Sequence, residues 1–116
     1  MRKLVNSITF PACEVEAVAK VCRRLARGWR CPGLLLFRHY FGKPGEVALS
    51  GGRLAFASRV LGFYADQMAH DLGDFREDLE GVAPEALELF ARASCRARAG
   101  LWRQEAQDLA SYVRGE

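Results

Sequence analysis

The 31 residues from Pro84 to about Arg114 carry the apolar periodicity of one amphipathic helix. Pro84 suits the first position of a helix, and Glu85 and Glu88 lie near its start, where negative charge is favourable. At 1.5 Å per residue this helix would be roughly 46 Å long, whereas a compact chain of 116 residues is only about 35 Å across. The helix must therefore kink, with Gly100 the natural position, or extend beyond the domain and pair with a second chain.

Two charged residues, Arg98 and Glu105, interrupt the apolar stripe of this segment. A buried charge has to be paired, and these two side chains start roughly 10 Å apart along the helix, too far for direct contact. Each therefore needs a partner on another helix or another chain, unless both reach solvent at the edge of the stripe. We expect a homodimer that forms through this helix, with contacts from Arg98, Leu101, Trp102 and Glu105. The apolar stripe itself comprises Leu87, Ala91, Ser94, Leu101, Leu109 and Tyr112.

Two further amphipathic helices are predicted, over residues 12–28 and 56–80. The first begins after Pro11 and is ended by Gly28 and a Cys-Pro-Gly turn, and the second is ended by Gly81. The apolar positions of the first are Val15, Val18, Ala19, Cys22, Leu25, Ala26 and Trp29. Those of the second form a heptad seam of Leu61, Ala65, Met68, Leu72, Phe75 and Leu79.

Strand signals are confined to the first half of the chain. Residues 4–10 are rich in β-branched and aromatic side chains and end at Pro11, which predicts a short strand. Residues 34–41 form an apolar run that fits either a buried strand or a short helix. The turn-forming residues 42–45 and the following residues 46–49 favour a β-hairpin.

These segments predict a single domain over residues 1–116 of the α+β class, mostly helical. Three amphipathic helices (12–28, 56–80 and 84–114) would pack on a small antiparallel sheet, and the last two would form an antiparallel hairpin. The alternative is an all-α bundle with a fourth short helix at 33–41.

Charge is divided unevenly along the chain. Residues 1–59 carry eleven Lys or Arg against three acids, a net charge of +8, and residues 60–116 carry six Arg against eleven acids, a net charge of −5. The polar face of the first helix offers a footprint for phosphate, anionic lipid or an acidic protein surface. The competing interpretation is that this face docks onto the acidic stretch 66–88 of the same or a neighbouring chain. The basic residues concerned are Lys20, Arg23, Arg24 and Arg27, with Arg30 beyond them.

An acidic row with one histidine is the only arrangement that suggests metal chemistry. Asp66, His70, Asp74 and Glu77 follow one another at steps of four, four and three residues, a spacing at which helices hold divalent metals in carboxylate bundles. At about 100° per residue, however, the row lies opposite the heptad seam of residues 56–80. We therefore expect a solvated face, with no metal, no cofactor and no catalytic residue.

Residues 47–61 partly resemble the helix-turn-helix motif of bacterial repressors. Arg53 and Ser58 depart from the motif, because they stand where it has apolar core residues, and the Pro-Gly pair of residues 44–45 leaves little room for its first helix. The resemblance covers about fifteen residues and implies that DNA-recognition residues would fall near Arg53–Arg59. The matching positions are Val47, Ala48, Gly52 and Leu61.

The remaining composition indicates a cytoplasmic protein of a bacterium. Four cysteines at spacings of nine, nine and sixty-four residues match no zinc motif, so we expect free, mostly buried thiols in a reducing compartment. No stretch approaches eighteen apolar residues, so we expect no membrane partner. Fourteen Arg against three Lys is typical of a GC-rich bacterial genome.

The function favoured by these patterns is that of a non-catalytic binding or regulatory protein that acts through protein–protein interaction as a homodimer. The alternative is a DNA- or RNA-binding regulator that uses the basic N-terminal half. A small metal-dependent enzyme built on the Asp66, His70 and Asp74 row is a distant third.

Overall fold

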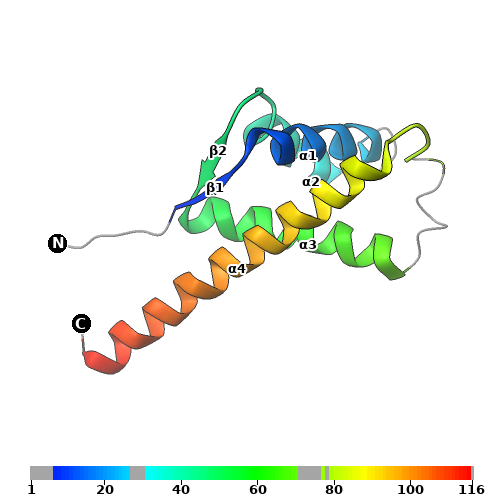
Figure 1. Cartoon of the computed structure of the whole chain (residues 1–116). Coiled ribbons are helices and arrows are strands. Elements are labelled where there is room, and N and C mark those ends of the chain that lie inside the picture. The colour runs from blue at the N-terminus through cyan, green and yellow to red at the C-terminus, as the bar shows by residue number, and fades with distance from the viewer. Residues whose placement is uncertain (1–6, 27–30, 71–76, 78, 116) are drawn as a thin grey trace.

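The structure is a computed structural model that describes residues 7–26, 31–70, 77 and 79–115, leaving aside the side chains of residues 31, 32, 104–109 and 111–113. The predicted mostly helical α+β architecture is confirmed, because the described helices accompany a two-stranded antiparallel sheet (Figure 1). In chain order the elements are β1 (Ile8–Phe10), α1 (Ala12–Leu25), α2 (Cys31–His39), β2 (Val47–Leu49), α3 (Gly51–His70) and α4 (Pro84–Arg114).

The sheet joins the start of the described chain to the segment before α3. Ile8 lies opposite Leu49 in the antiparallel ladder of β1 and β2. Ile8 and Phe10 are buried while Thr9 between them is exposed, as expected for a strand with one face on the core. Pro11 then ends β1, and its carbonyl accepts the first helical hydrogen bonds of α1, so that strand and helix follow without a loop.

The prediction of a strand over residues 34–41 is wrong, because this segment lies within and just after α2. Gly33 and Leu36 are buried whereas Leu34 and Leu35 between them are exposed, which is helical spacing and not the alternation of a strand. The fourth short helix of the all-α alternative is therefore present. The predicted second strand of the hairpin exists as β2, but its partner is β1.

Helix α3 begins earlier than predicted, at Gly51 instead of residue 56. Gly51 has a φ of 56°, a conformation that glycine adopts without strain, and it turns the chain from β2 directly into the helix. The resemblance of residues 47–61 to a helix-turn-helix fails here, because they form β2 and the first half of one continuous helix. Described α3 ends at His70, and residues 71–76 of the predicted helix lie outside the described residues.

Helix α4 is continuous from Pro84 to Arg114, so the expected alternative of a kink at Gly100 is wrong. Gly100 is buried, and a Cβ at this position would overlap the side chain of Ile8 in β1 and lie 3.3 Å from Leu54 Cδ2 in α3. The glycine therefore lets α4 approach the sheet closely. The C-terminal part of α4 extends past the other elements (Figure 1), and the chain measures 51 × 29 × 23 Å along its principal axes.

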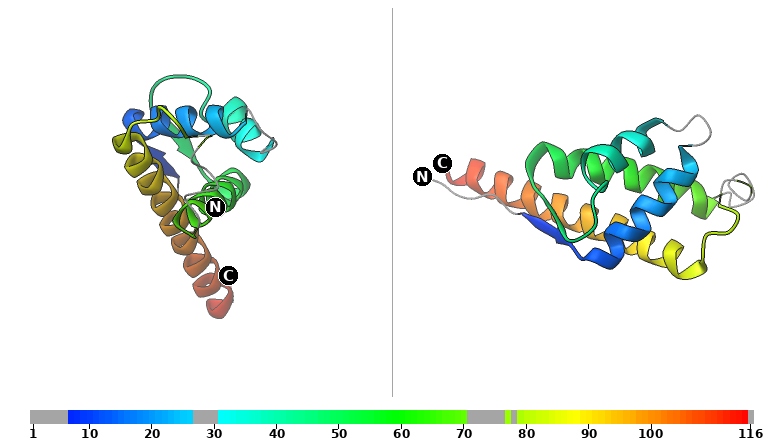
Figure 2. Two further views of the ribbon diagram at one scale, coloured as in Figure 1. Left: turned by 90° about the vertical axis from the view of Figure 1, so that its right-hand side faces the viewer. Right: turned by 90° about the horizontal axis from the view of Figure 1, so that it is seen from above.

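Three helices surround the core. Seen along the long axis of the molecule, α1, α3 and α4 form the sides of a triangle, with α2 beside α1 (Figure 2). Helix α4 packs against both α1 and α3. The rings of Phe10 in β1 and Phe41 after α2 meet edge to face, with centroids 5.4 Å apart, and both are buried. Most of the first half of α4 is thus fixed from two sides, which sets the position of its remaining surfaces.

Candidate functional site

The basic face predicted on α1 is present, but two of its arginines make contacts within the chain. Lys20 is exposed. The guanidinium of Arg23 lies 5.0 Å from the ring centroid of Phe37 in α2, a cation–π arrangement. Arg24 donates a hydrogen bond to the backbone carbonyl of Glu80. Arg27 and Arg30 lie outside the described residues.

The contact of Arg24 is relevant to the question of which surface the basic face packs against. Glu80 belongs to the acidic stretch 66–88, and Arg24 reaches its backbone carbonyl. A Cβ added at Gly81 would lie 3.0 Å from a guanidinium nitrogen of Arg24, so the side chain crosses directly over this turn. Part of the basic face therefore meets the acidic stretch of its own chain, and nucleic-acid binding by Lys20 and Arg23 stays a prediction.

An ion pair between described residues of α1 and α4 was not predicted. Glu14 of α1 is 2% exposed, and Arg96 of α4 binds it with two parallel hydrogen bonds, from Nε to Oε1 at 2.9 Å and from Nη2 to Oε2 at 2.8 Å. The hydrogen bond to Glu14 raises the pKa of Arg96 above its usual value. The sequence alone indicates that Glu14 is buried, because it lies on the apolar line of α1 that continues through Val18, Val21 and Leu25.

Arg98 was predicted to need a partner on another helix or another chain. Its partner lies on α3. Its Nη2 lies 2.9 Å from Oδ2 of Asp66 and donates to the carbonyl oxygen of Gly62 at 2.8 Å. A Cβ at Gly62 would come within 2.6 Å of this guanidinium, so the glycine makes the room that Arg98 occupies. The side chain of Glu105 lies outside the described residues.

The apolar stripe predicted for α4 is partly wrong. Ala91 is exposed and Leu101 is half-buried, while Ser94 is buried as predicted. The buried positions recur instead at steps of four and three as Ala86, Phe90, Ala93, Ala97 and Gly100, with Ser94 beside this line.

The described members of the acidic row are exposed, as we expected. They are Asp66, His70 and Glu77, and Asp66 is in addition bound by Arg98 of α4. Asp74 lies outside the described residues. Within the described ranges, no three His, Cys, Asp or Glu residues are grouped closely enough to hold a metal ion.

The thiols are less buried than predicted. The described thiols Cys13, Cys22 and Cys95 are free, as predicted. Cys22 is buried, and this burial raises the pKa of its thiol to about 12, whereas Cys13 and Cys95 are exposed. The side chain of Cys31 lies outside the described residues.

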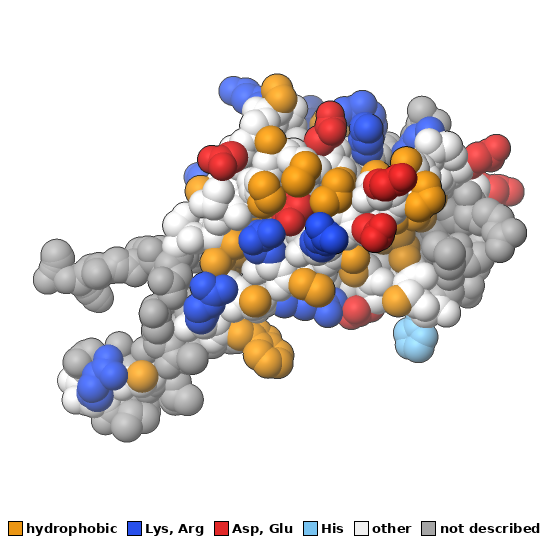
Figure 3. All heavy atoms as spheres, in the orientation of Figure 1, with side chains coloured by type: hydrophobic (Ala, Val, Ile, Leu, Met, Phe, Trp, Pro, Cys, Tyr) orange, Lys and Arg blue, Asp and Glu red, His pale blue; other side chains and the backbone are white. Residues whose placement is uncertain are grey.

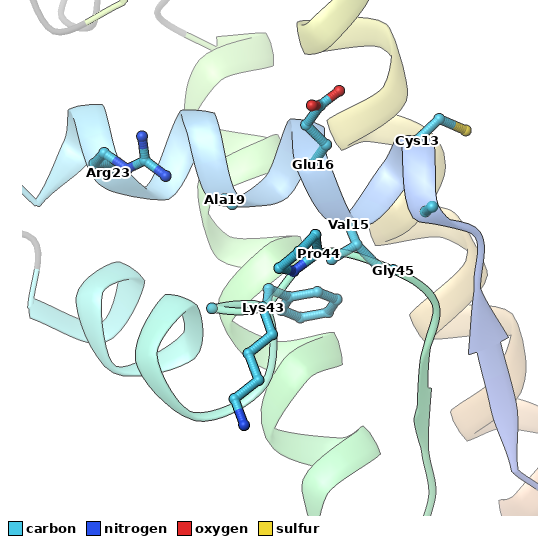
Figure 4. Close-up of a pocket in the computed structure, with 11 residues that line it drawn as sticks. Cys13, Val15, Glu16, Ala19, Arg23, Lys43, Pro44 and Gly45 are labelled. Carbon is cyan, nitrogen blue, oxygen red and sulfur yellow. The ribbon is translucent and has the colours of Figure 1, made fainter.

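A hollow of about 360 Å³ lies between α1 and the loop that follows α2 (Figure 4). Val15, Ala19 and Pro44 contribute apolar walls. The charged ends of Arg23 and Lys43 point away from one another, on opposite sides of the hollow (Figure 4). Catalytic pockets bring polar groups together on one point, and these two do not converge.

Exposed large apolar side chains occur on three of the described helices. Leu34 and Leu35 are exposed on α2, whereas Phe63 of α3 is 55% exposed and Trp102 of α4 is 75% exposed. Residues three or four apart on a helix are surface neighbours, so Phe63 adjoins Asp66 and Trp102 adjoins Arg98. Each aromatic side chain is therefore a neighbour, on its own helix, of one member of the Asp66–Arg98 ion pair. We call Phe63, Asp66, Arg98 and Trp102 the aromatic patch.

Comparison with known proteins gave no match. No model of a protein family matches the chain, and searches of curated proteins and of solved structures also found no match. None of the helices in the described part of the chain combines the length and the apolar character needed to cross a bilayer.

Proposed function

We propose that this chain is a non-catalytic binding protein of the bacterial cytoplasm that acts as a homodimer and regulates a partner by protein–protein contact. The observation that supports the dimer is the aromatic patch. Trp and Arg are the residues most enriched among those that dominate binding energy at protein interfaces, and here Trp102 lies beside Arg98 with 75% of its surface exposed.

The charges of the aromatic patch make it self-complementary. A twofold-symmetric dimer brings the same surface of both subunits together, so each positive group has to meet a negative one from the same patch. Asp66 and Arg98 supply one charge of each sign. They are 68% and 43% exposed, which leaves both able to contact a second chain. The aromatic rings on either side would exclude water from these contacts.

The length of α4 adds to this argument. Its C-terminal part extends beyond the other elements of the described chain (Figure 1). A helix that lies alone in water gains little stability from its own hydrogen bonds, and most helices are stabilised by packing an apolar face. A second copy that covers Phe63 and Trp102 would also lie along this extension.

The experiment is sedimentation at micromolar concentration. We expect about twice the mass of one 12.9 kDa chain. The double variant Phe63→Ser/Trp102→Ser should sediment as a monomer with its helical circular dichroism unchanged. The matched control is Leu34→Ser/Leu35→Ser, which removes the same kind of exposed apolar surface from α2 and should remain dimeric. A monomeric wild-type protein, or a dimer that survives loss of both aromatic side chains, would contradict the proposal.

A further inference from the structure

The flank of α4 that lies next to α1 carries three arginines in line. Arg92, Arg96 and Arg103 follow one another at steps of four and seven residues, which places them within about 40° of arc and over roughly 16 Å of helix. All three are exposed, and we call them the arginine row. They line an open hollow of about 490 Å³ whose other lining residues are Ala91, Cys95 and Ala99. In the space-filling view, Lys and Arg side chains follow the middle of α4 on the face toward the viewer (Figure 3).

The arginine row and the aromatic patch lie on different sides of α4. Arg96 contacts α1 through Glu14, whereas Arg98 contacts α3 through Asp66. At 100° per residue, Trp102 lies about 100° around the helix from Arg103. A partner could therefore occupy the arginine row while the aromatic patch is covered by a second copy of the chain.

The chemistry of the hollow favours a phosphate backbone over a protein surface. Protein interfaces combine Arg with aromatic or large apolar anchors, and the residues that line this hollow include no such apolar anchor. Its small side chains allow a linear partner to approach the helix closely. Guanidinium groups bind phosphate in bidentate geometry, and a row of them suits charges that repeat along a strand. We propose that the arginine row binds the phosphate backbone of a nucleic acid without reading its sequence.

The contact with Glu14 positions the middle arginine of the row. Glu14 accepts the N–H of Nε and one N–H of Nη2 of Arg96, which leaves the second N–H of Nη2 and both N–H groups of Nη1 for a phosphate. Because Glu14 is 2% exposed, its carboxylate is not presented to a ligand at the surface, although it offsets part of the charge of Arg96. Arg92 and Arg103 therefore carry most of the attraction.

Acidic residues limit the proposed site at one end. Glu85 and Glu88 lie in the first turns of α4 on the same side as the arginine row, and both are exposed. A phosphate strand would be repelled there. The strand is thus expected to lie along α4 from Arg92 toward the C-terminus.

The test is fluorescence anisotropy with a labelled DNA duplex of mixed sequence, titrated with the wild-type protein at several low salt concentrations. Arg92→Gln/Arg103→Gln removes two charges and leaves the Arg96–Glu14 contact intact, and Gln is a comparable helix former. We expect this variant to lose affinity by at least about tenfold at low salt, and the log–log dependence on salt to flatten by about 1.8, or 0.9 per phosphate contact.

Two further double variants, each of which also removes two positive charges, serve as controls. Arg53→Gln/Arg59→Gln removes two exposed arginines from α3, and Lys20→Gln/Arg23→Gln removes two cations from the basic face of α1. Both should lose much less affinity than Arg92→Gln/Arg103→Gln and should keep the salt dependence of the wild type, because their charges lie outside the proposed phosphate contact.

Four outcomes would overturn the proposal. They are no binding by the wild-type protein at low salt, an equal loss in a control variant, a clear preference for one DNA sequence, or tighter binding of a labelled glutamate-rich peptide than of the duplex. The last would assign the arginine row to an acidic protein. The arginine row and the aromatic patch are separate, so Arg92→Gln/Arg103→Gln should keep the oligomeric state of the wild type. Failure of this test and failure of the dimer test can therefore be told apart.

Discussion

Two arginines, two residues apart on α4, hold the helix to its neighbours in different ways. Arg96 binds Glu14, whose surface is 2% exposed, with two parallel hydrogen bonds. Arg98 binds Asp66, whose side chain is 68% exposed, with one close contact. The arginine side chains themselves are equally accessible, at 42% and 43%. The two ion pairs therefore differ in the environment of the carboxylate.

This difference indicates that the Arg96–Glu14 pair stabilises the fold, whereas the Arg98–Asp66 pair is available for binding. A carboxylate out of water depends on its partner, because an unpaired buried charge is very costly. A carboxylate in water is solvated with or without its partner, and exposed pairs are worth about 0–1 kcal/mol. Glu14 therefore has to keep Arg96 for the fold to be stable, whereas Asp66 can exchange Arg98 for a cationic group on another molecule.

The largest effect is expected from removing the partner of the buried carboxylate. Arg96→Ala leaves Glu14 inside the protein without a counter-charge, and we expect the free energy of unfolding to fall by about 3 kcal/mol, since Arg96 is itself partly screened by water. Chemical denaturation followed by circular dichroism measures the change. The control is Glu14→Gln in the Arg96→Ala background, which removes the buried charge and should restore part of the stability. A loss below about 0.5 kcal/mol would show that Glu14 reaches water.

A smaller effect is expected from the two glycines at which α4 meets its neighbours. Gly100→Ala places a methyl group against Ile8 and Leu54. Overpacking of this kind costs about 2 kcal/mol, offset by about 1 kcal/mol of helix propensity, so stability should fall by about 1 kcal/mol.

Gly62→Ala is the matched variant on α3, because its methyl group would meet only the flexible end of Arg98. The side chain can move away, so we expect unfolding within about 0.5 kcal/mol of the wild type. If Gly62→Ala were the more destabilising of the two, Arg98 would be more tightly fixed than an exposed pair allows.

The smallest effect on the stability of the single chain is expected from Asp66→Asn. It removes the charge of an exposed pair and should cost about 0.5 kcal/mol, measured at a concentration where the protein is monomeric. Added salt should abolish this small difference, because it screens exposed charges, and should leave the effect of Arg96→Ala largely unchanged. Equal salt dependence of the two variants would contradict the distinction between the pairs.

Local patterns in the sequence predicted much of the fold. The long α4 and the helix after Pro11 follow from apolar periodicity and from the positions of Pro and Gly. The strand predicted over residues 4–10 from its β-branched and aromatic residues is present as β1 at residues 8–10, and residues 4–6 lie outside the described residues. Residues 34–41 could not be assigned in the same way, because a short apolar run fits a helix and a strand alike and only its neighbours decide.

The contacts of the site depend on the arrangement of elements far apart in the chain. A kink at Gly100 was one of two alternatives predicted for α4, but Gly100 instead makes room for the side chain of Ile8. A glycine in a helical pattern looks the same in both roles. By composition alone Glu14 is one of three acids in the basic half of the chain, although its place on the apolar line of α1 indicates a buried charge. Its partner lies 82 residues away, which no local pattern could indicate.

The most direct test of a dimer built on the aromatic patch is a mixing experiment with charge-reversed chains. Arg98→Asp makes the patch acidic and Asp66→Arg makes it basic, so each variant alone should repel its own copy and sediment as a monomer near 12.9 kDa. An equimolar mixture should form a heterodimer of about twice that mass, because the two altered patches are complementary. Dimers of either variant alone, or a mixture that stays monomeric although both chains are folded, would contradict the proposed interface.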